Sequence, residues 1–260
     1  MRGPHNIWRL IRTGATLERT GAMNVVLDAF EAPRSLRFVA KALGKPFMWL
    51  GYKGDPDMPP ATRALTALGP AYIKLGQVLS TRPDVVGAEL AVQLRVLQDK
   101  LPPFSIEEAK AEVERELGQP VDQIFSEFSE PVAAASIAQV HRARVAATGE
   151  DVAVKVLRPG IERAFGKDVD AFYLAARIME ICAPGARRLR PIEVIEHFDG
   201  VVQGELDLRL ESSAASEFAA NTENDEGFQL PKIKWEFSAR RVMTLGWADG
   251  APMGDNDAID

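Results

Sequence analysis

One lysine inside an alternating apolar segment is the side chain of this protein best suited to hold an anion. In the run VAVKV, residues 152–156, the three valines point to one face of a strand, because successive side chains alternate between the two faces. Ala153 and Lys155 then share the opposite face. A charge on a buried strand is costly unless an opposite charge pairs with it. Lys155 is therefore predicted to hold a carboxylate or, when a ligand is bound, its phosphates.

The segment before this strand is a turn rich in alanine, made of Ala133, Ala134, Ala135 and Ser136. Protein kinases carry the pattern V-A-[IV]-K, whose lysine contacts nucleotide phosphates beneath a loop rich in glycine. The corresponding turn here contains no glycine. On its own the tetrapeptide VAVK is weak evidence, because many buried strands contain one lysine whose ammonium group reaches the strand edge. Its position after the alanine-rich turn favours phosphate binding.

Three carboxylates in the run GELDLRLES are candidate partners of this lysine. A helix is predicted from about Pro191 to Asn221, and on it Asp207 and Glu211 are four residues apart and share a face. Glu205 is turned away from Glu211 by roughly 120°. One carboxylate group could meet Lys155 while another faces a different element, and the spacing does not decide between Glu205 and Glu211. The alternative is a solvated acidic face, since Arg209 lies nearby.

A second polar pair occurs in Lys74-Leu75-Gly76-Gln77. Lys74 and Gln77 are three residues apart and lie on one helix face. A glycine inside a helix costs about 1 kcal/mol relative to alanine, so Gly76 indicates close packing or function. The tetrapeptide alone is unspecific.

The elements that must position these residues change character near Pro131. Residues 1–53 are predicted to be a basic helical arm interrupted at Gly44 and Pro46, and residues 60–130 a helical extension. From Val132 the apolar period changes from helical to alternating, which marks a sheet-containing unit over residues 131–248. Residues 249–260 would begin a further lobe. Further predicted elements are a helix opened by Gly69-Pro70, helices at 84–99, 106–117 (with the capping box Ser105–Glu108) and 161–182, two strands joined at 148–150, and two short strands within 228–248.

Composition excludes several classes of protein. No run of 18 apolar residues occurs, so no transmembrane helix is expected within these 260 residues. The single cysteine, Cys182, excludes an internal disulfide and is typical of a reducing compartment. His5, His141 and His197 have no metal-ligand spacing, so no metal site is predicted.

The net charge of −6 is distributed unevenly. Residues 1–53 hold nine Lys/Arg against three Asp/Glu, a balance of +6, which leaves −12 for the rest of the chain. Nucleic acid is therefore not expected as a partner. A basic segment that also contains aromatic residues has two interpretations, an anionic membrane surface or a helical arm packed on the rest of the protein. The aromatic residues concerned are Trp8, Phe30, Phe38, Phe47 and Trp49.

Taken together, five motifs in this order resemble the UbiB family of atypical, protein-kinase-like proteins (aarF-domain kinases), which are linked to ubiquinone biosynthesis. The resemblance covers roughly residues 60–250. It implies an α+β fold in which a helical N-terminal extension accompanies a kinase-like small lobe with a mostly antiparallel sheet. The motifs are LGPAYIKLGQVLSTRPD (68–84), LQDKLPPF (97–104), PVAAASIAQVHRA (131–143), VAVKVLRPGI (152–161) and ELDLRLE (205–211).

The resemblance also implies roles for the candidate residues. Lys155 would contact the α- and β-phosphates of ATP or ADP, and Glu211 would be its helix partner. The alanine-rich turn, Ala133–Ser136, would replace the glycine-rich loop, and adenine would lie near Leu245 and Trp247. Lys74 and Gln77 would form the KxGQ motif, which engages the ExD motif of Glu205 and Asp207.

Other parts of the expected machinery have no candidate here. A kinase-like enzyme needs a catalytic-loop aspartate, an asparagine and a DFG-type aspartate for Mg²⁺, and Asp249, Asp255 and Asp257 lack the flanking residues of such motifs. No catalytic residue is therefore predicted within this chain, the Mg²⁺ ligands are expected in a missing large lobe, and little phosphoryl transfer is expected from these residues alone.

The resemblance implies a cytoplasmic protein peripheral to the inner membrane face, an atypical kinase or ATPase with ubiquinone-biosynthesis proteins as partners. The alternative is a non-catalytic scaffold whose helical extension binds prenyl lipid or partner proteins. An ordinary protein kinase is disfavoured by the alanine-rich turn together with the KxGQ helix.

Overall fold

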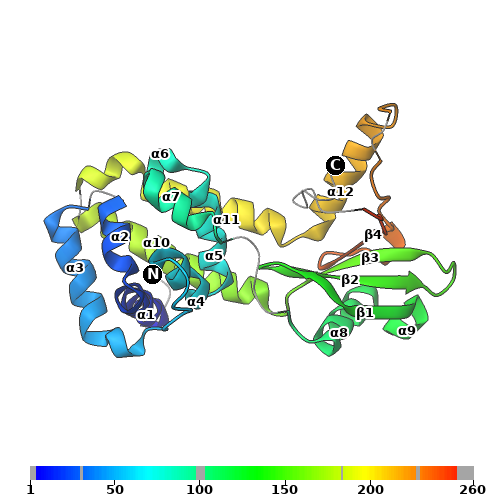
Figure 1. The fold of residues 1–260 in the computed structure, drawn as a ribbon, viewed down its shortest axis with the longest axis horizontal. Coiled ribbons are helices and arrows are strands. Elements are labelled where there is room, and N and C mark those ends of the chain that lie inside the picture. The colour runs from blue at the N-terminus through cyan, green and yellow to red at the C-terminus, as the bar shows by residue number, and fades with distance from the viewer. Residues whose placement is uncertain (1–3, 30–31, 98–102, 183, 227–228, 251–260) are drawn as a thin grey trace. The chain divides into compact units, whose positions relative to one another are not determined.

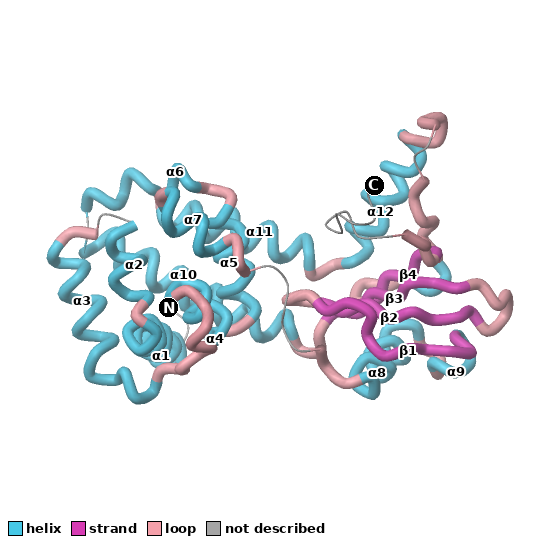
Figure 2. The backbone as a smooth tube through the Cα atoms, viewed as in Figure 1, coloured by secondary structure: helices cyan, strands magenta, loops and turns pink. Residues whose placement is uncertain are grey.

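The structure is a computed structural model, and it describes residues 4–29, 32–97, 103–182, 184–226 and 229–250. The chain divides into two compact units, and each is built from two separate stretches of sequence. One unit comprises residues 1–101 and 160–203 and is helical; the other comprises residues 102–159 and 204–260 and contains the sheet (Figures 1 and 2).

The helical unit packs N-terminal helices against a long helix from later in the sequence. Tyr72 of α5 meets Phe172 of α10 edge to face, with ring centroids 4.7 Å apart. Arg9 of α1 pairs with Asp168 of α10, which ties the two stretches of sequence together. The elements of this unit are α1 (Pro4–Thr20), α2 (Ala22–Ala29), α3 (Arg34–Gly44), η1 (Lys45–Leu50), α4 (Pro60–Leu68), α5 (Pro70–Ser80), α6 (Pro83–Val86), α7 (Ala88–Leu94), α10 (Ile161–Cys182), η2 (Pro184–Leu189) and most of α11 (Pro191–Glu205).

The second unit is a four-stranded antiparallel sheet in the order β1-β2-β3-β4, with α8 in contact with β1, β3 and β4. This arrangement confirms the predicted α+β fold with a mostly antiparallel sheet. The elements are α8 (Ile106–Leu117), α9 (Val121–Ile124), β1 (Phe125–Ala134), β2 (Ala138–Val145), β3 (Asp151–Leu157), α12 (Leu208–Asn221), η3 (Trp235–Phe237) and β4 (Val242–Gly246).

The core of the sheet unit follows from the alternation seen in the sequence. Val152, Val154 and Val156 are fully buried, and they join a cluster that includes Ala109 and Val113 of α8. The Ser105 hydroxyl accepts the amide of Glu108, and the Glu108 carboxylate accepts the amide of Ser105, so the predicted capping box starts α8.

Two predicted helices are each divided in the structure. The helix expected over residues 84–99 is interrupted at Gly87, whose φ of +77° is incompatible with a right-handed helix, giving α6 and α7. The helix expected from Pro191 to Asn221 ends at Glu205, and α12 begins at Leu208. Asp207, with extended backbone angles, is the N-cap of α12 and accepts the amide of Arg209. Glu205 and Asp207 therefore do not share a helix with Glu211.

The strands and unit boundaries also differ from expectation. β1 begins at Phe125 rather than near Val132, because Phe125 lies in the core against Phe128 and Phe237. Only one regular strand forms among the described residues of 228–248, because the η3 turn leaves Ile233 with an isolated bridge to Leu245. The compact units divide at Pro102 rather than Pro131, so α8 belongs to the sheet unit, and α10 belongs to the helical unit.

Across the described part of the chain, the structure contains no helix that is both long and apolar enough to span a bilayer.

Candidate functional site

Lys155 lies near the middle of the sheet and is flanked by a strand on each side. Its register partners are Val140 on β2 and Met243 on β4. Because paired residues in an antiparallel sheet point to the same face, all three lie on the face opposite the buried valines. The side chain of Lys155 is 24% exposed, so its ammonium group is neither fully hydrated nor sealed in the core.

The partner of Lys155 in the structure is Glu211. The ammonium nitrogen, Nζ, lies 2.6 Å from Oε1 and 2.7 Å from Oε2 of Glu211, so both carboxylate oxygens are engaged. The start of α12 is fixed by two hydrogen bonds: the amide of Leu208 donates to the carbonyl of Arg240 at 2.8 Å, and Asp207 caps the helix. The contact spans 56 residues of sequence and therefore depends on this placement of α12.

Two further predicted residues share the face of Lys155. Ala133 pairs with Val140 and so extends the row that runs through Lys155. Leu245 pairs with Ala153, one row away on the same face. Ala134 pairs with Gln139 and lies on the other face. The sheet thus places an ammonium group, a small side chain and an apolar side chain on one surface.

The alanine-rich turn is shorter than predicted, since Ala133 and Ala134 belong to β1. The amide of Ala135 donates to the carbonyl of Ala138 at 2.8 Å and closes the turn. Ser136 is buried within it. The turn is therefore held by its own backbone rather than by glycine flexibility.

Trp247 directly follows β4 and lies beside Asp151, the first residue of β3. Its amide donates to the Asp151 carbonyl at 3.1 Å, and its ring stacks under the guanidinium of Arg142, 4.8 Å from the centroid. Its indole N–H donates to Asp249 at 2.9 Å. Asp255 and Asp257 lie outside the described residues.

An ion cluster beside Trp247 was missed by the sequence reasoning. Asp151 accepts hydrogen bonds from Arg142 at 2.6 Å and from Arg144 at 2.9 Å, and these bonds hold the pKa of its carboxyl below the usual value. The signal in the sequence is the alternation Arg142-Ala143-Arg144, which puts both arginines on one strand face opposite an acidic residue of the next strand.

A buried polar network on β2 was missed as well. The side-chain oxygen of Gln139 accepts the amide of Phe104 at 3.0 Å, and its nitrogen lies 2.9 Å from Nε2 of His141. Nδ1 of His141 lies 2.8 Å from the carbonyl of Ser129. Burial lowers the pKa of His141 below its ordinary value, so the network holds the neutral imidazole.

Lys74 and Gln77 lie on α5 in the helical unit. The Gln77 side-chain amide donates to the carbonyl of Leu97 at 2.9 Å, just beyond α7. A Cβ on Gly76 would come within 2.7 Å of Leu65 Cδ1 and closer still to Leu97, so this glycine permits the close packing of α4, α5 and the end of α7.

The ExD residues lie in the sheet unit. Asp207 forms an ion pair with Arg209 at 2.6 Å, and the Arg209 hydrogen bonds lower the pKa of its carboxyl. Glu205 is the last residue of α11. The contact between KxGQ and ExD stays a prediction, since the two motifs belong to different units.

Residues 96–260 match the family described as ABC1 atypical kinase-like domain. Relatives named "Probable protein kinase UbiB" are similar over much of the chain. The protein from Marinobacter nauticus is 41% identical over 198 residues, which are 76% of this chain and 36% of the relative. The protein from Azotobacter vinelandii is 37% identical over 255 residues, which are 96% of this chain and 47% of the relative. The chain thus spans about half of these relatives or less.

Among solved structures, the chain is similar to one described as "The complex structure of Rv3197-erythromycin from Mycobacterium tuberculosis". The TM-score is 0.51 at 28% identity, covering 70% of this chain and 45% of the other. The sequence motifs, the sheet with its lysine–glutamate pair and these similarities agree. The chain belongs to the family of ABC1 atypical kinase-like domains.

Proposed function

We propose that the sheet unit binds the phosphates of ATP or ADP through Lys155, as part of an atypical kinase or ATPase that supports ubiquinone biosynthesis. The observation that carries this proposal is the two-oxygen ion pair between Lys155 and Glu211 on one face of the sheet. In protein kinases a strand lysine and a helix glutamate form such a pair, which positions the lysine for the nucleotide phosphates.

The chemistry of the pair suits this role. A lysine ammonium group is a compact cation with three donors, so it can keep the Glu211 contact while it donates to a phosphate oxygen. Ala133, exposed on the same face, leaves room beside the ammonium group because its side chain is a single methyl. In the proposed complex, the phosphates lie over this row and the adenine lies near Leu245 and Trp247.

Mg²⁺ would neutralise the phosphate charge when bound. No group of three or more His, Cys, Asp or Glu side chains suited to a metal ion occurs among the residues that the structure describes. The described residues therefore do not fit a protein-held Mg²⁺ site, and none of them is assigned to one. Their proposed contribution is to bind and orient the nucleotide.

The test is nucleotide binding by the 260-residue chain, measured by calorimetry with ADP, for the unaltered protein, Lys155→Met and Lys234→Met. Lys234 is a matched control, because it pairs with Glu150 at 2.6 Å and its side chain is 22% exposed. Charge-assisted hydrogen bonds contribute about 1.5–3 kcal/mol, so Lys155→Met should weaken binding at least about tenfold. Lys234→Met should leave affinity unchanged. Equal affinities for all three proteins would refute the proposal.

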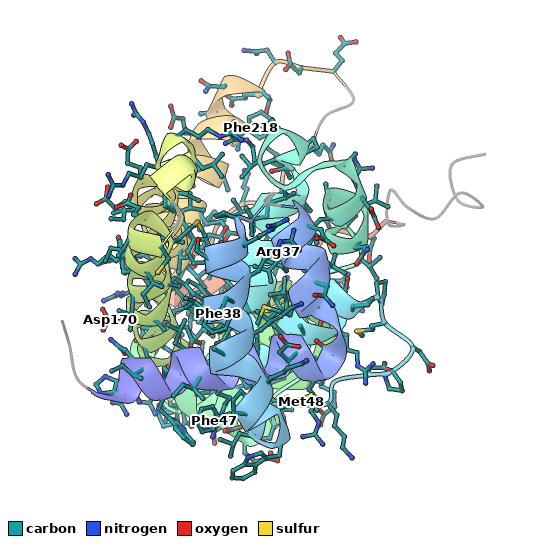
Figure 3. The ribbon with its side chains drawn as sticks, turned by 90° about the vertical axis from the view of Figure 1, so that its left-hand side faces the viewer. Arg37, Phe38, Phe47, Met48, Asp170 and Phe218 are labelled. Carbon is teal, nitrogen blue, oxygen red and sulfur yellow. The ribbon has the colours of Figure 1, made fainter. Side chains whose placement is uncertain are left out.

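A second candidate function, a lipid-binding scaffold, is favoured by the exposed apolar residues of the N-terminal helices. The side chains of Phe38 on α3 and Trp49 on η1 are 75% and 73% exposed. Figure 3 shows Phe38, Phe47 and Met48 on these elements, which also carry the basic residues Lys41 and Lys45. Apolar and basic residues in one surface are what an anionic membrane binds.

This candidate predicts that the chain sediments with vesicles containing phosphatidylserine, with or without nucleotide. The double variant Phe38→Ser/Trp49→Ser should lose this binding, whereas Ile181→Ser should keep it, because Ile181 is equally exposed, at 73%, on α10. Retention of vesicle binding by the double variant would exclude this surface.

A further inference from the structure

The helical unit contains an apolar cavity of about 300 Å³ that is partly open to the surface. Its wall is formed by side chains of α1, α2, α4, α5, α6, α7, α10, η2 and α11, so it lies within a single unit. Well-packed interiors contain few voids larger than a water molecule. An engineered cavity of about 150 Å³ binds benzene, and this one has about twice that volume.

The wall of the cavity is almost entirely apolar. Twenty of the described residues line it, and of these only Thr13 and Tyr72 carry a polar side-chain atom. The hydroxyl oxygens of these two residues lie 2.5 Å apart, and the Thr13 hydroxyl also donates to the carbonyl of Arg9 at 3.0 Å. Burial raises the pKa of Tyr72 to about 12, as expected for a phenol in surroundings of low polarity.

Such a cavity does not suit water or a charged ligand. A buried water needs two to four polar partners, and the hydroxyls of the wall are already bonded to each other. No lysine, arginine, aspartate or glutamate is among the lining residues that the structure describes. An apolar group is therefore the chemistry that the wall can accept, because it exchanges water for contacts with leucine, valine and methionine side chains at no polar cost.

We propose that this cavity binds a single uncharged hydrocarbon chain of roughly twelve carbons, twice the six of benzene. The proposal does not rest on nucleotide binding by the sheet unit. The chain could be a free apolar molecule or the tail of a lipid, and the shared chemistry is the hydrocarbon.

The test is binding of straight-chain alcohols to the 260-residue chain, measured by calorimetry and by the shift in thermal midpoint. Each methylene buried should raise affinity about fourfold, until the cavity is full at about twelve carbons. Longer alcohols should then gain nothing. This chain-length limit can be measured on the unaltered protein. A continued rise in affinity with chain length, or no binding, would overturn the proposal.

A pair of variants tests whether the alcohols bind in this cavity. Ala175 of α10 lines the cavity, and Ala175→Phe adds a benzene-sized ring that fills about half of it. The chain length beyond which affinity stops rising should fall to about six carbons, while the thermal midpoint of the variant without ligand stays equal or rises. Ala88→Phe is the control, since Ala88 is exposed on α7 and does not line the cavity. An unchanged limit in Ala175→Phe would place the alcohols elsewhere and overturn the proposal.

A final arm separates the two sources of the hydrocarbon. A lysophosphatidylcholine with a twelve-carbon tail, kept below its micelle concentration, presents the same chain beneath a charged head group. If it competes with dodecanol, the tail of a lipid enters the cavity. If only dodecanol binds, the occupant is a free apolar molecule. Both outcomes support the site, and failure of both ligands excludes it.

Discussion

The buried glutamate of α8 gives the sharpest prediction about stability. Glu112 is 1% exposed, and its two oxygens are divided between two arginines. One oxygen lies 2.5 Å from Nε of Arg241, whose side chain is 13% exposed, and the other lies 2.6 Å from Arg115, whose side chain is 67% exposed. The first contact ties α8 to the residue just before β4; the second lies within α8.

Removing this carboxylate deletes the ion pair that Glu112 makes with the nearly buried guanidinium of Arg241. Breaking a buried pair on one side costs about 3–5 kcal/mol, whereas removing one hydrogen bond from a buried acceptor that keeps another costs about 1–3 kcal/mol. We expect Glu112→Ala to lower the free energy of unfolding of the sheet unit by about 3 kcal/mol or more. Arg115→Ala should lower it by less, about 1–2 kcal/mol, because Glu112 keeps its contact with Arg241. A domain is typically stable by only about 5–15 kcal/mol, so the first loss is easily measured.

The assay is urea unfolding followed by tryptophan fluorescence in a background that carries Trp8→Phe and Trp49→Phe. The remaining tryptophans, Trp235 and Trp247, both lie in the sheet unit, so the signal reports on that unit and not on the helical one. Similar losses of about 1 kcal/mol or less for Glu112→Ala and Arg115→Ala would refute the reasoning, because burial would then make no difference to the pair.

Three further outcomes are expected. Burial lowers the pKa of His141 in the folded state, so the unfolded chain binds the proton first as pH falls. Stability should therefore be constant above about pH 6.5 and decline below it. In thermal unfolding between pH 7.5 and pH 5.5, His141→Gln should reduce the dependence of stability on pH. Glu211→Gln should change the free energy of unfolding by no more than about 1 kcal/mol, since the Glu211 side chain is 47% exposed. A larger loss of that free energy in urea unfolding would mean that the pair with Lys155 is chiefly structural. Asp207→Ala should cost about 1 kcal/mol through loss of the α12 cap, whereas Asp207→Asn, which keeps an accepting oxygen, should cost a few tenths; equal losses in the same assay would contradict the capping role.

Local patterns predicted much of the sheet unit. The alternation around Lys155 required only the two-residue period of a strand, and the three valines are buried as expected. The capping box of α8 and the bounds of α10 were equally accessible, because they depend on residues close in sequence. The lysine–carboxylate pairing was predicted in kind, but spacing could not choose between Glu205 and Glu211.

What could not be predicted depends on contacts between distant residues. The chain leaves the helical conformation between Glu205 and the N-cap Asp207. Leu206 is buried there and the Leu208 amide donates to the Arg240 carbonyl, and no local pattern predicts that bond. An amphipathic helix such as α8 shows that one face is covered but not which element covers it. The apolar cavity combines side chains of nine elements, so its existence follows from their packing and not from any motif.

The interleaved sequence of the two units has a consequence for synthesis. The helical unit needs residues 160–203 to complete its packing, and the last of these is synthesised about one hundred residues after its first part ends. At rates of about 5–20 residues per second, the first helices wait roughly 5–20 s for α10 and α11. During that interval the leucine and valine faces that later line the cavity are exposed, so slowed translation of residues 102–159 should prolong the period in which the nascent chain is open to aggregation or to capture by chaperones.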